Sequence, residues 1–285
     1  MTNISLWNNL DTQKRKYHNG GQKKNDRESE AYVMDIRFEK REHLKEKPDQ
    51  KHLGFGKYMT DYMFVMDWTK EEGWKDARIV PEGPITMDPA CVTLHYAQET
   101  FEGMKAYRTA EGKIQLFRPE MNAKRMINSN ARLCMPEFPV DMFVEAVKAL
   151  VKVEEDWVPS EPETSLYIRP FMFATEAALG VHMASAYKFM IICCPVGAYY
   201  AEGINPVKIL VEDELVRAVK GGTGFTKCGG NYAGSILGQV KAEKMGYSQV
   251  LWLDGEHRKY VEEVGTMNIM FKIAGEIYTA QIGRA

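Results

Sequence analysis

Long apolar runs, a strong net charge and paired cysteines are all missing from this sequence of 285 residues. No apolar stretch approaches the ~20 residues that a membrane-spanning helix needs, so we expect no membrane partner. The formal net charge of -2 gives no reason to expect nucleic acid or an anionic surface as a partner. The N-terminus is polar and basic without an apolar core, which does not match a secretory signal.

The five cysteines are odd in number and lack the paired spacing of a metal site, and the six histidines are scattered. We therefore predict no metal centre and a reducing, cytoplasmic location. With 45% hydrophobic and 27% charged residues, the chain is long enough for two domains and a sizeable core.

The most informative segment is Gly-Gly-Thr-Gly-Phe-Thr-Lys-Cys-Gly-Gly-Asn-Tyr at residues 221–232. Glycines flank Lys227 on both sides, which allows close backbone approach and leaves little bulk around its amine. This setting favours a lysine that forms a Schiff base with an aldehyde cofactor. The alternatives are a flexible surface loop and a phosphate-binding loop. The phosphate-loop motif needs Gly where the chain has Thr226, and Ser or Thr where it has Cys228.

The residues after Lys227 predict regular structure. Apolar side chains recur at helical spacing after Tyr232, which predicts one amphipathic helix over residues 232–245, ended by Gly246. Residues 249–254 and 269–273 are predicted to be strands.

Glu263 lies between these two strands, next to the Gly265 turn. A carboxylate at the mouth of a strand is commonly a solvated turn residue. A pyridine-aldehyde cofactor, however, needs an acidic partner that keeps its ring nitrogen protonated. We predict this role for Glu263 rather than for Glu262.

Eight motifs in series resemble the branched-chain amino acid aminotransferases, which are pyridoxal 5′-phosphate enzymes of fold type IV. In chain order they are Leu-His-Tyr (94–96), Phe-Glu-Gly-Met-Lys-Ala-Tyr (101–107), Leu-Phe-Arg-Pro (116–119), Lys-Arg-Met (124–126), Thr-Ser-Leu-Tyr-Ile-Arg-Pro (164–170), Cys-Pro-Val-Gly-Ala-Tyr (194–199), the lysine segment, and Glu-Val-Gly-Thr-Met-Asn (263–268). Each motif alone is weak, but the series covers roughly residues 35–280 in the family's order.

The resemblance implies roles for the cofactor side of the site. Lys227 would hold the cofactor as an internal aldimine and would then move the proton between substrate and cofactor. Arg125 would clamp the phosphate with two parallel donors, although by sequence alone it is more simply a surface arginine on a helix. The other cofactor contacts would come from Tyr232, Glu263 and Thr266.

The resemblance also implies a substrate site for leucine, isoleucine, valine and glutamate. Arg169 would meet the side-chain carboxylate of glutamate, and Tyr96 would reach the α-carboxylate. As bare sequence each aromatic residue is more often part of a core. The apolar walls would be formed by Phe55, Phe101, Tyr167, Val181, Tyr199 and Met267.

We therefore expect an α+β protein of fold type IV. The expected organisation is a disordered extension (residues 1–34), a small α/β domain (35–195), an interdomain loop (196–206) and a β-rich cofactor domain (207–285). Strands are predicted at 62–67, 115–117 and 188–193, and a helix is predicted at 140–153. The resemblance implies a cofactor domain that continues by some tens of residues, so we expect an incomplete domain that binds the cofactor weakly.

The expected activity is transamination of leucine, isoleucine and valine with 2-oxoglutarate, in amino-acid biosynthesis, by a homodimer. One alternative is an inactive, truncated fragment of such an enzyme. Another is a different fold type IV enzyme, such as a D-amino acid aminotransferase or an aminodeoxychorismate lyase. The residues 55–68 and the pairing of Tyr167 with Arg169 argue against this second alternative.

Overall fold

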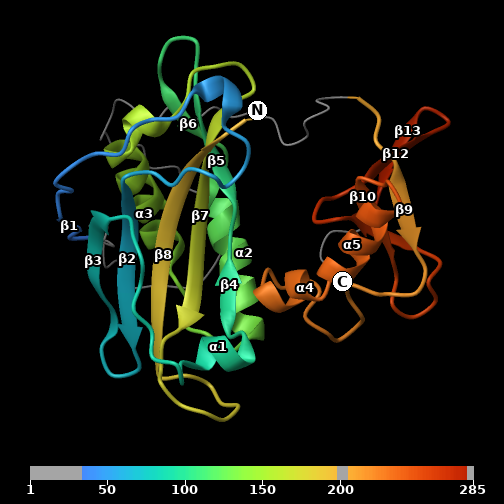
Figure 1. Ribbon diagram of the computed structural model, residues 1–285. Helices are drawn as coiled ribbons and strands as arrows, with labels where there is room; N and C mark the ends of the chain where they lie inside the picture. Colours follow the sequence, from blue (N-terminus) through green and yellow to red (C-terminus); the bar gives the residue numbers. More distant parts are fainter. Residues whose placement is uncertain (1–33, 198–204, 281–285) are drawn as a thin grey trace, which may run out of the picture.

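The computed structural model describes residues 34–197 and 205–280. The first part of the chain forms a sheet with strand order β1-β3-β2-β8-β7-β5-β6, and β4 pairs with β7 at one side (Figure 1). The strands are β1 (Arg37–Phe38), β2 (Tyr62–Thr69), β3 (Gly73–Pro81), β4 (Glu99–Phe101), β5 (Met104–Arg108), β6 (Ile114–Leu116), β7 (Ser165–Ala174) and β8 (Ala186–Val196).

Helices α2 and α3 cover one face of this sheet (Figure 1). The helical elements here are η1 (Gln50–His52), α1 (Val92–Tyr96), α2 (Pro119–Arg132), α3 (Val140–Val153) and η2 (Glu155–Trp157). Helix α3 has the predicted bounds because its apolar residues recur every three or four positions, and this stripe is buried. The predicted strands at 62–67 and 188–193 lie inside β2 and β8, while the third is shifted by one residue to β6.

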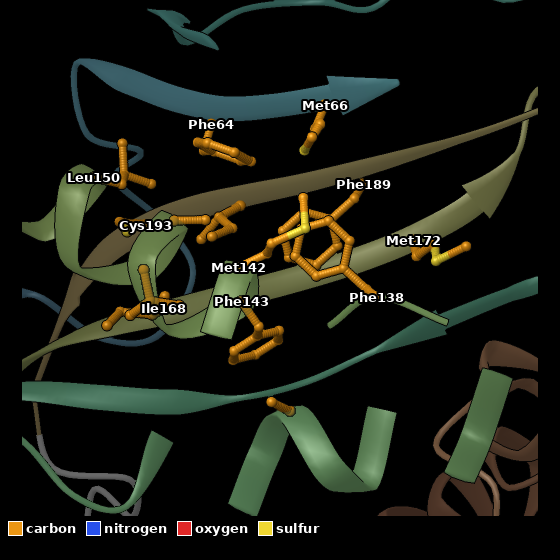
Figure 2. Close-up of a cluster of buried hydrophobic side chains, with 14 of the residues drawn as sticks. Phe64, Met66, Phe138, Met142, Phe143, Leu150, Ile168, Met172, Phe189 and Cys193 are labelled. Atoms are coloured by element: carbon orange, nitrogen blue, oxygen red, sulfur yellow. The ribbon is translucent and has the colours of Figure 1, made fainter. Parts of the chain in front are cut away.

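The main core lies between this helical layer and the sheet, and aromatic side chains dominate its centre (Figure 2). Phe138 stacks on Phe189 with ring centroids 3.8 Å apart, and Trp74 meets Phe138 edge-on at 4.7 Å. Such pairs add to the stabilisation from apolar burial. This core gives the sheet a rigid base, and one edge of the sheet carries β4.

The second part of the chain contains a three-stranded sheet in the order β11-β10-β9. Strands β9 (Ile209–Glu212) and β10 (Gln249–Leu253) are parallel, and the connection between them carries α4 (Gly229–Ala233) and α5 (Ile236–Lys244). Strand β11 (Val261–Val264) pairs antiparallel with β10. Strands β12 (Met270–Ile273) and β13 (Glu276–Thr279) form a separate hairpin.

The predicted single helix over residues 232–245 is wrong. Two helices form instead, interrupted near Gly234, and Ile236 and Leu237 are 59% and 64% exposed. The buried face of α5 is the side with Gly238, because the ring of Trp252 packs there: a Cβ atom on this glycine would lie 2.5 Å from the ring. The absence of a side chain at Gly238 therefore determines which face of α5 is buried, rather than the stripe of apolar residues. The predicted end at Gly246 is present, with φ 77°.

Within the described ranges, no helix is long and apolar enough to cross a bilayer. The same ranges hold no group of three or more His, Cys, Asp or Glu side chains that is suited to a metal ion, and all five cysteines are free thiols.

Candidate active site around Lys227

Helix α4 lies beside β4 and α2 (Figure 1). Lys227, two residues before α4, makes backbone hydrogen bonds to Phe101 on β4 and to the Ser129 side chain on α2. Its Nζ atom donates a hydrogen bond of 2.9 Å to the hydroxyl of Tyr232. The same atom lies 4.6 Å from the ring centroid of Phe101 and 5.1 Å from that of Tyr232. Burial lowers the pKa of Lys227, and the positive charge of Arg125 lowers it further. A neutral amine, which is the nucleophilic form, is therefore more accessible here than on an exposed lysine.

The residues around Lys227 form a fixed loop. The side-chain amide of Asn231 donates to the carbonyl oxygens of Thr223 and Thr226, both at 2.7 Å. The Thr223 hydroxyl donates a bond of 2.8 Å to the side-chain oxygen Oδ1 of Asn231. The glycines of the segment thus lie in a closed turn that is held by one buried asparagine, and Lys227 follows directly after it.

Arg125 projects from α2 and makes a two-point ion pair with Glu102. The distances are 2.7 Å from Nε and 2.6 Å from Nη2 to the two carboxylate oxygens. The Glu102 side chain is fully buried, whereas that of Arg125 is 52% exposed. A guanidinium has five N–H donors, so three remain beyond those that Glu102 receives from it. Arg125 is therefore oriented by a carboxylate and still has donors for an anion.

Glu263 on β11 pairs with Arg217, whose Nε atom lies 2.7 Å from its Oε1 atom. Burial raises the pKa of Glu263, while the charges of Arg217 and then Lys227 oppose this rise. The charge of Glu263 in turn contributes to the raised pKa of Tyr232, whose main cause is burial. Glu263 therefore interacts electrostatically with both Lys227 and Tyr232.

Arg169 on β7 is held between two aromatic rings. Its guanidinium carbon lies 4.7 Å from the ring centroid of Phe101 and 5.3 Å from that of Tyr167, and Nη2 donates to the Tyr167 hydroxyl at 2.8 Å. Its Nε atom is buried and has no hydrogen-bond partner among the described residues. The ring of Phe55 meets Tyr167 edge-on at 4.9 Å. A Cβ atom on Gly103 would lie 2.3 Å from the Tyr167 hydroxyl, so a larger residue here would displace the Tyr167 side chain.

Not every predicted site residue lies in this group. The Tyr96 hydroxyl accepts a bond of 2.8 Å from the amide of Gly180, and neighbouring Val181 is 87% exposed. These residues form a separate group at the end of α1. Met267 exchanges two backbone hydrogen bonds with Val264, at 2.9 and 3.0 Å, which closes a turn with exposed Thr266 at its tip. Tyr199 lies outside the described residues.

Sequence reasoning missed several polar partners in this region. Glu102 and Arg217 pair with two predicted residues, and Glu99 and Ser129 bind the backbone of the lysine segment. The one available signal was the sequence Phe-Glu-Gly: a carboxylate between apolar residues and a glycine, if buried, needs a cationic partner.

The assembled group brings together complementary chemistry. It contains a desolvated amine, a phenol beside it, a carboxylate that is partly buried, and two guanidinium groups. An amine of this kind attacks an aldehyde, a carboxylate protonates a ring nitrogen, and a guanidinium binds a phosphate or carboxylate.

Comparison with known proteins gives a consistent result. A model of the family "Amino-transferase class IV" matches residues 99–285. The chain is 54% identical over 247 residues to branched-chain-amino-acid aminotransferase 2 of Bacillus subtilis (strain 168), covering 87% of this chain and 68% of that protein. The crystal structure of the T.th. branched-chain amino acid aminotransferase with pyridoxamine 5′-phosphate is similar, with a TM-score of 0.63, 30% identity, and coverage of 76% of this chain and 68% of that one. The same enzyme complexed with N-(5′-phosphopyridoxyl)-L-glutamate gives a TM-score of 0.61 at 28% identity, covering 76% and 67%.

Proposed function

This chain belongs to the class IV aminotransferases, and we propose that it transfers the amino group of leucine, isoleucine or valine to 2-oxoglutarate. The relatives at 54% identity carry the name of branched-chain aminotransferase, which supports this substrate class. Enzymes of the family use pyridoxal 5′-phosphate as cofactor.

The residues around Lys227 fit this cofactor. Among the described residues, Lys227 has no carboxylate within ion-pair distance, and its amine is hydrogen-bonded to the phenol of Tyr232. Arg125 retains donors for a phosphate, and Glu263 offers a carboxylate on the Lys227 side for a ring nitrogen. When bound, the cofactor supplies an aldehyde that takes up the amino group and a ring that withdraws electrons.

Lys227 performs the central proton transfer in this proposal. Its Nζ atom would hold the cofactor, and the free amine would carry a proton from the substrate α-carbon. The lowered pKa of Lys227 keeps a basic, neutral amine available for this step. The Tyr232 hydroxyl, 2.9 Å away, holds the amine in one orientation.

Two kinds of substrate side chain share one site in this proposal. Phe55 and Tyr167, which meet edge-on, form an apolar wall for branched aliphatic groups. Arg169 lies beside this wall and pairs with the side-chain carboxylate of glutamate or 2-oxoglutarate. Tyr199 and Met267, which the resemblance implies as further wall residues, remain predictions.

The homodimer remains part of the proposal. Apolar side chains are exposed around the end of α1 and the loop that follows β7: Leu94, Leu179, Val181 and Met183 are 58%, 70%, 87% and 60% exposed. An exposed apolar surface of this kind is typical of a contact between subunits. Light scattering after size-exclusion chromatography should give a mass of twice 32.5 kDa.

The observation that carries the proposal is the desolvated amine of Lys227 between Phe101 and Tyr232. We expect Lys227→Ala to abolish transamination between leucine and 2-oxoglutarate, while Lys220→Ala, an exposed lysine seven residues earlier, retains it. Borohydride reduction of the cofactor-loaded protein should attach the cofactor to the peptide that contains Lys227. Equal turnover in the wild type and Lys227→Ala would refute the assignment.

A further inference from the structure

Three hydrogen bonds fix the backbone on both sides of Lys227. The amide of Phe101 donates to the Lys227 carbonyl at 3.0 Å, and the Lys227 amide donates to the hydroxyl of Ser129 at 3.0 Å. Two residues later, the amide of Gly229 donates to the carboxylate of Glu99. Because these bonds bracket the Cα atom of Lys227, they determine the direction in which its side chain leaves the backbone.

Glu99 is well placed to act as an anchor. It lies two residues before Phe101 on β4, so both side chains project from the same face of the strand toward the lysine segment. On the opposite face, the hydroxyl of Thr100 hydrogen-bonds to the side chain of buried Asn130 at 2.6 Å, which ties β4 to α2. The carboxylate of Glu99 therefore projects from a strand that is itself immobilised.

The contact between Glu99 and Gly229 is so close that a larger residue at the glycine would displace the Glu99 carboxylate. A Cβ atom on Gly229 would lie 2.0 Å from Oε1 of Glu99. Burial raises the pKa of the Glu99 carboxyl, while the Gly229 amide and then Arg169 oppose this rise. A charged acceptor in such a partly dry setting makes a stronger bond to an amide than a neutral acceptor does.

Ser129 provides the second anchor and connects it to Arg125. These two residues are four positions apart on α2, so they lie on the same face of the helix, one turn apart. Arg125 carries the guanidinium that Glu102 orients, and the Ser129 hydroxyl accepts the bond from the Lys227 amide. Helix α2 thus sets the separation between Arg125 and Lys227.

We propose that Glu99 is a positioning residue for amino-group transfer, which acts through the Gly229 amide, together with Ser129, to hold Lys227 Nζ over Phe101 and beside Tyr232. This role rests on the proposed function, whereas the contact itself does not. The expected effect on catalysis is large, because a displacement of a reacting group such as the Lys227 amine by ~1 Å lowers the rate by about a hundredfold.

The first experiment measures the anchor without cofactor or substrate. Glu99→Ala, Glu99→Gln and Ser129→Ala are compared with Glu111→Ala, which removes an exposed carboxylate from a turn. Two quantities are measured in the full chain: hydrogen–deuterium exchange of peptides that contain the Gly229 amide, and the pKa of Lys227 from the pH dependence of its reductive methylation.

In Glu99→Ala we expect exchange at the Gly229 amide to accelerate at least about tenfold, and the pKa of Lys227 to rise toward that of a free lysine. Glu99→Gln should stay close to wild type, because its amide oxygen still accepts the bond. Ser129→Ala should shift the Lys227 pKa in the same direction. The proposal is overturned if Glu99→Ala matches the Glu111→Ala control in both quantities, or if exchange accelerates equally in all peptides.

The second experiment links the anchor to the reaction. With cofactor, leucine and 2-oxoglutarate, Glu99→Ala should lower kcat about ten- to a hundredfold and leave KM for leucine within about threefold of wild type. An unchanged kcat overturns the positioning role. A wild type without transaminase activity would instead refute the proposed function, and the exchange and pKa measurements would still decide whether Glu99 orients Lys227.

Discussion

Arg125 and Glu102 form a two-point ion pair in which the acid is fully buried and the base is half exposed. Asn122 adds a hydrogen bond of 2.8 Å to the same carboxylate. Replacing Arg125 would therefore have two effects: it would remove a proposed phosphate ligand, and it would leave the buried carboxylate of Glu102 without its cationic partner.

We therefore predict that Arg125→Ala lowers the free energy of unfolding by about 2–4 kcal/mol, in addition to its effect on the cofactor. Because Asn122 still donates a hydrogen bond to Glu102 in this variant, the expected loss of stability is smaller than for a buried charge without any partner. Urea denaturation of the chain without cofactor measures this difference.

The double variant Arg125→Ala with Glu102→Gln is the control for this prediction. It removes the unpaired charge, so it should recover most of the lost stability but none of the phosphate binding. Equal stability of Arg125→Ala and wild type would show that the ion pair contributes nothing to the fold.

The second prediction concerns Arg169, which touches Tyr167 and Phe101. Arg169→Ala should slow the half-reaction with glutamate at least about tenfold more than the half-reaction with leucine, because only glutamate carries a second carboxylate. Stopped-flow measurement of each half-reaction separates the two. Tyr167→Phe keeps the ring but loses the hydroxyl that orients Arg169, so it should show the same preference with a smaller loss. Similar losses in both half-reactions would assign Arg169 a structural role.

Much of the fold was predictable because local patterns and tertiary packing agree. The apolar periodicity of residues 140–153 matches α3, and the apolar run at 249–254 matches β10 apart from its last residue. The predicted fold type and family are confirmed by the family match and by the solved structures. The lysine segment places Lys227 and Tyr232 five residues apart, but their hydrogen bond was not predicted from the sequence.

The rest depended on which segments meet in space. Nothing in the sequence indicates that Arg217 pairs with Glu263, because the register of β11 on β10 and the preceding loop set this contact. The sequence likewise gives no sign that Glu99 binds the Gly229 amide, because this contact depends on the packing of α4 beside β4. The apolar stripe of residues 232–245 does not indicate which face of α5 is buried, because the ring of Trp252 packs against Gly238.

The third prediction concerns pH and the buried carboxyl of Glu154, which is 1% exposed and accepts a hydrogen bond from the Tyr62 amide. Burial raises its pKa from 4.5 to about 7, and the nearby charge of Asp61 adds to the rise. Since the pKa is higher in the folded state, its stabilisation is complete below pH 4.5 and is lost as the pH rises through about 7.

We expect this group to lower the free energy of unfolding by up to about 3 kcal/mol across that range. The Glu154→Gln variant keeps an acceptor for the Tyr62 amide but does not titrate, so its stability should vary less between pH 4.5 and 7. Chemical denaturation at several pH values measures both curves. Parallel curves for the variant and wild type would contradict the prediction.

The last prediction tests the packing that fixes α5 on its sheet. A Cβ atom at Gly238 would lie 2.5 Å from the ring of Trp252, which is 1% exposed and donates from Nε1 to the Gly265 carbonyl at 3.2 Å. The Trp252 ring has no free space to move into, so Gly238→Ala should lower the free energy of unfolding by about 1–3 kcal/mol, although alanine favours helices. Gly230→Ala in α4 is the matched control: its Cβ would meet no atom within 4 Å, so that variant should be as stable as wild type or more so. Denaturation followed by tryptophan fluorescence compares the two, and a Gly238→Ala variant as stable as Gly230→Ala would show that the ring does not determine the buried face of α5.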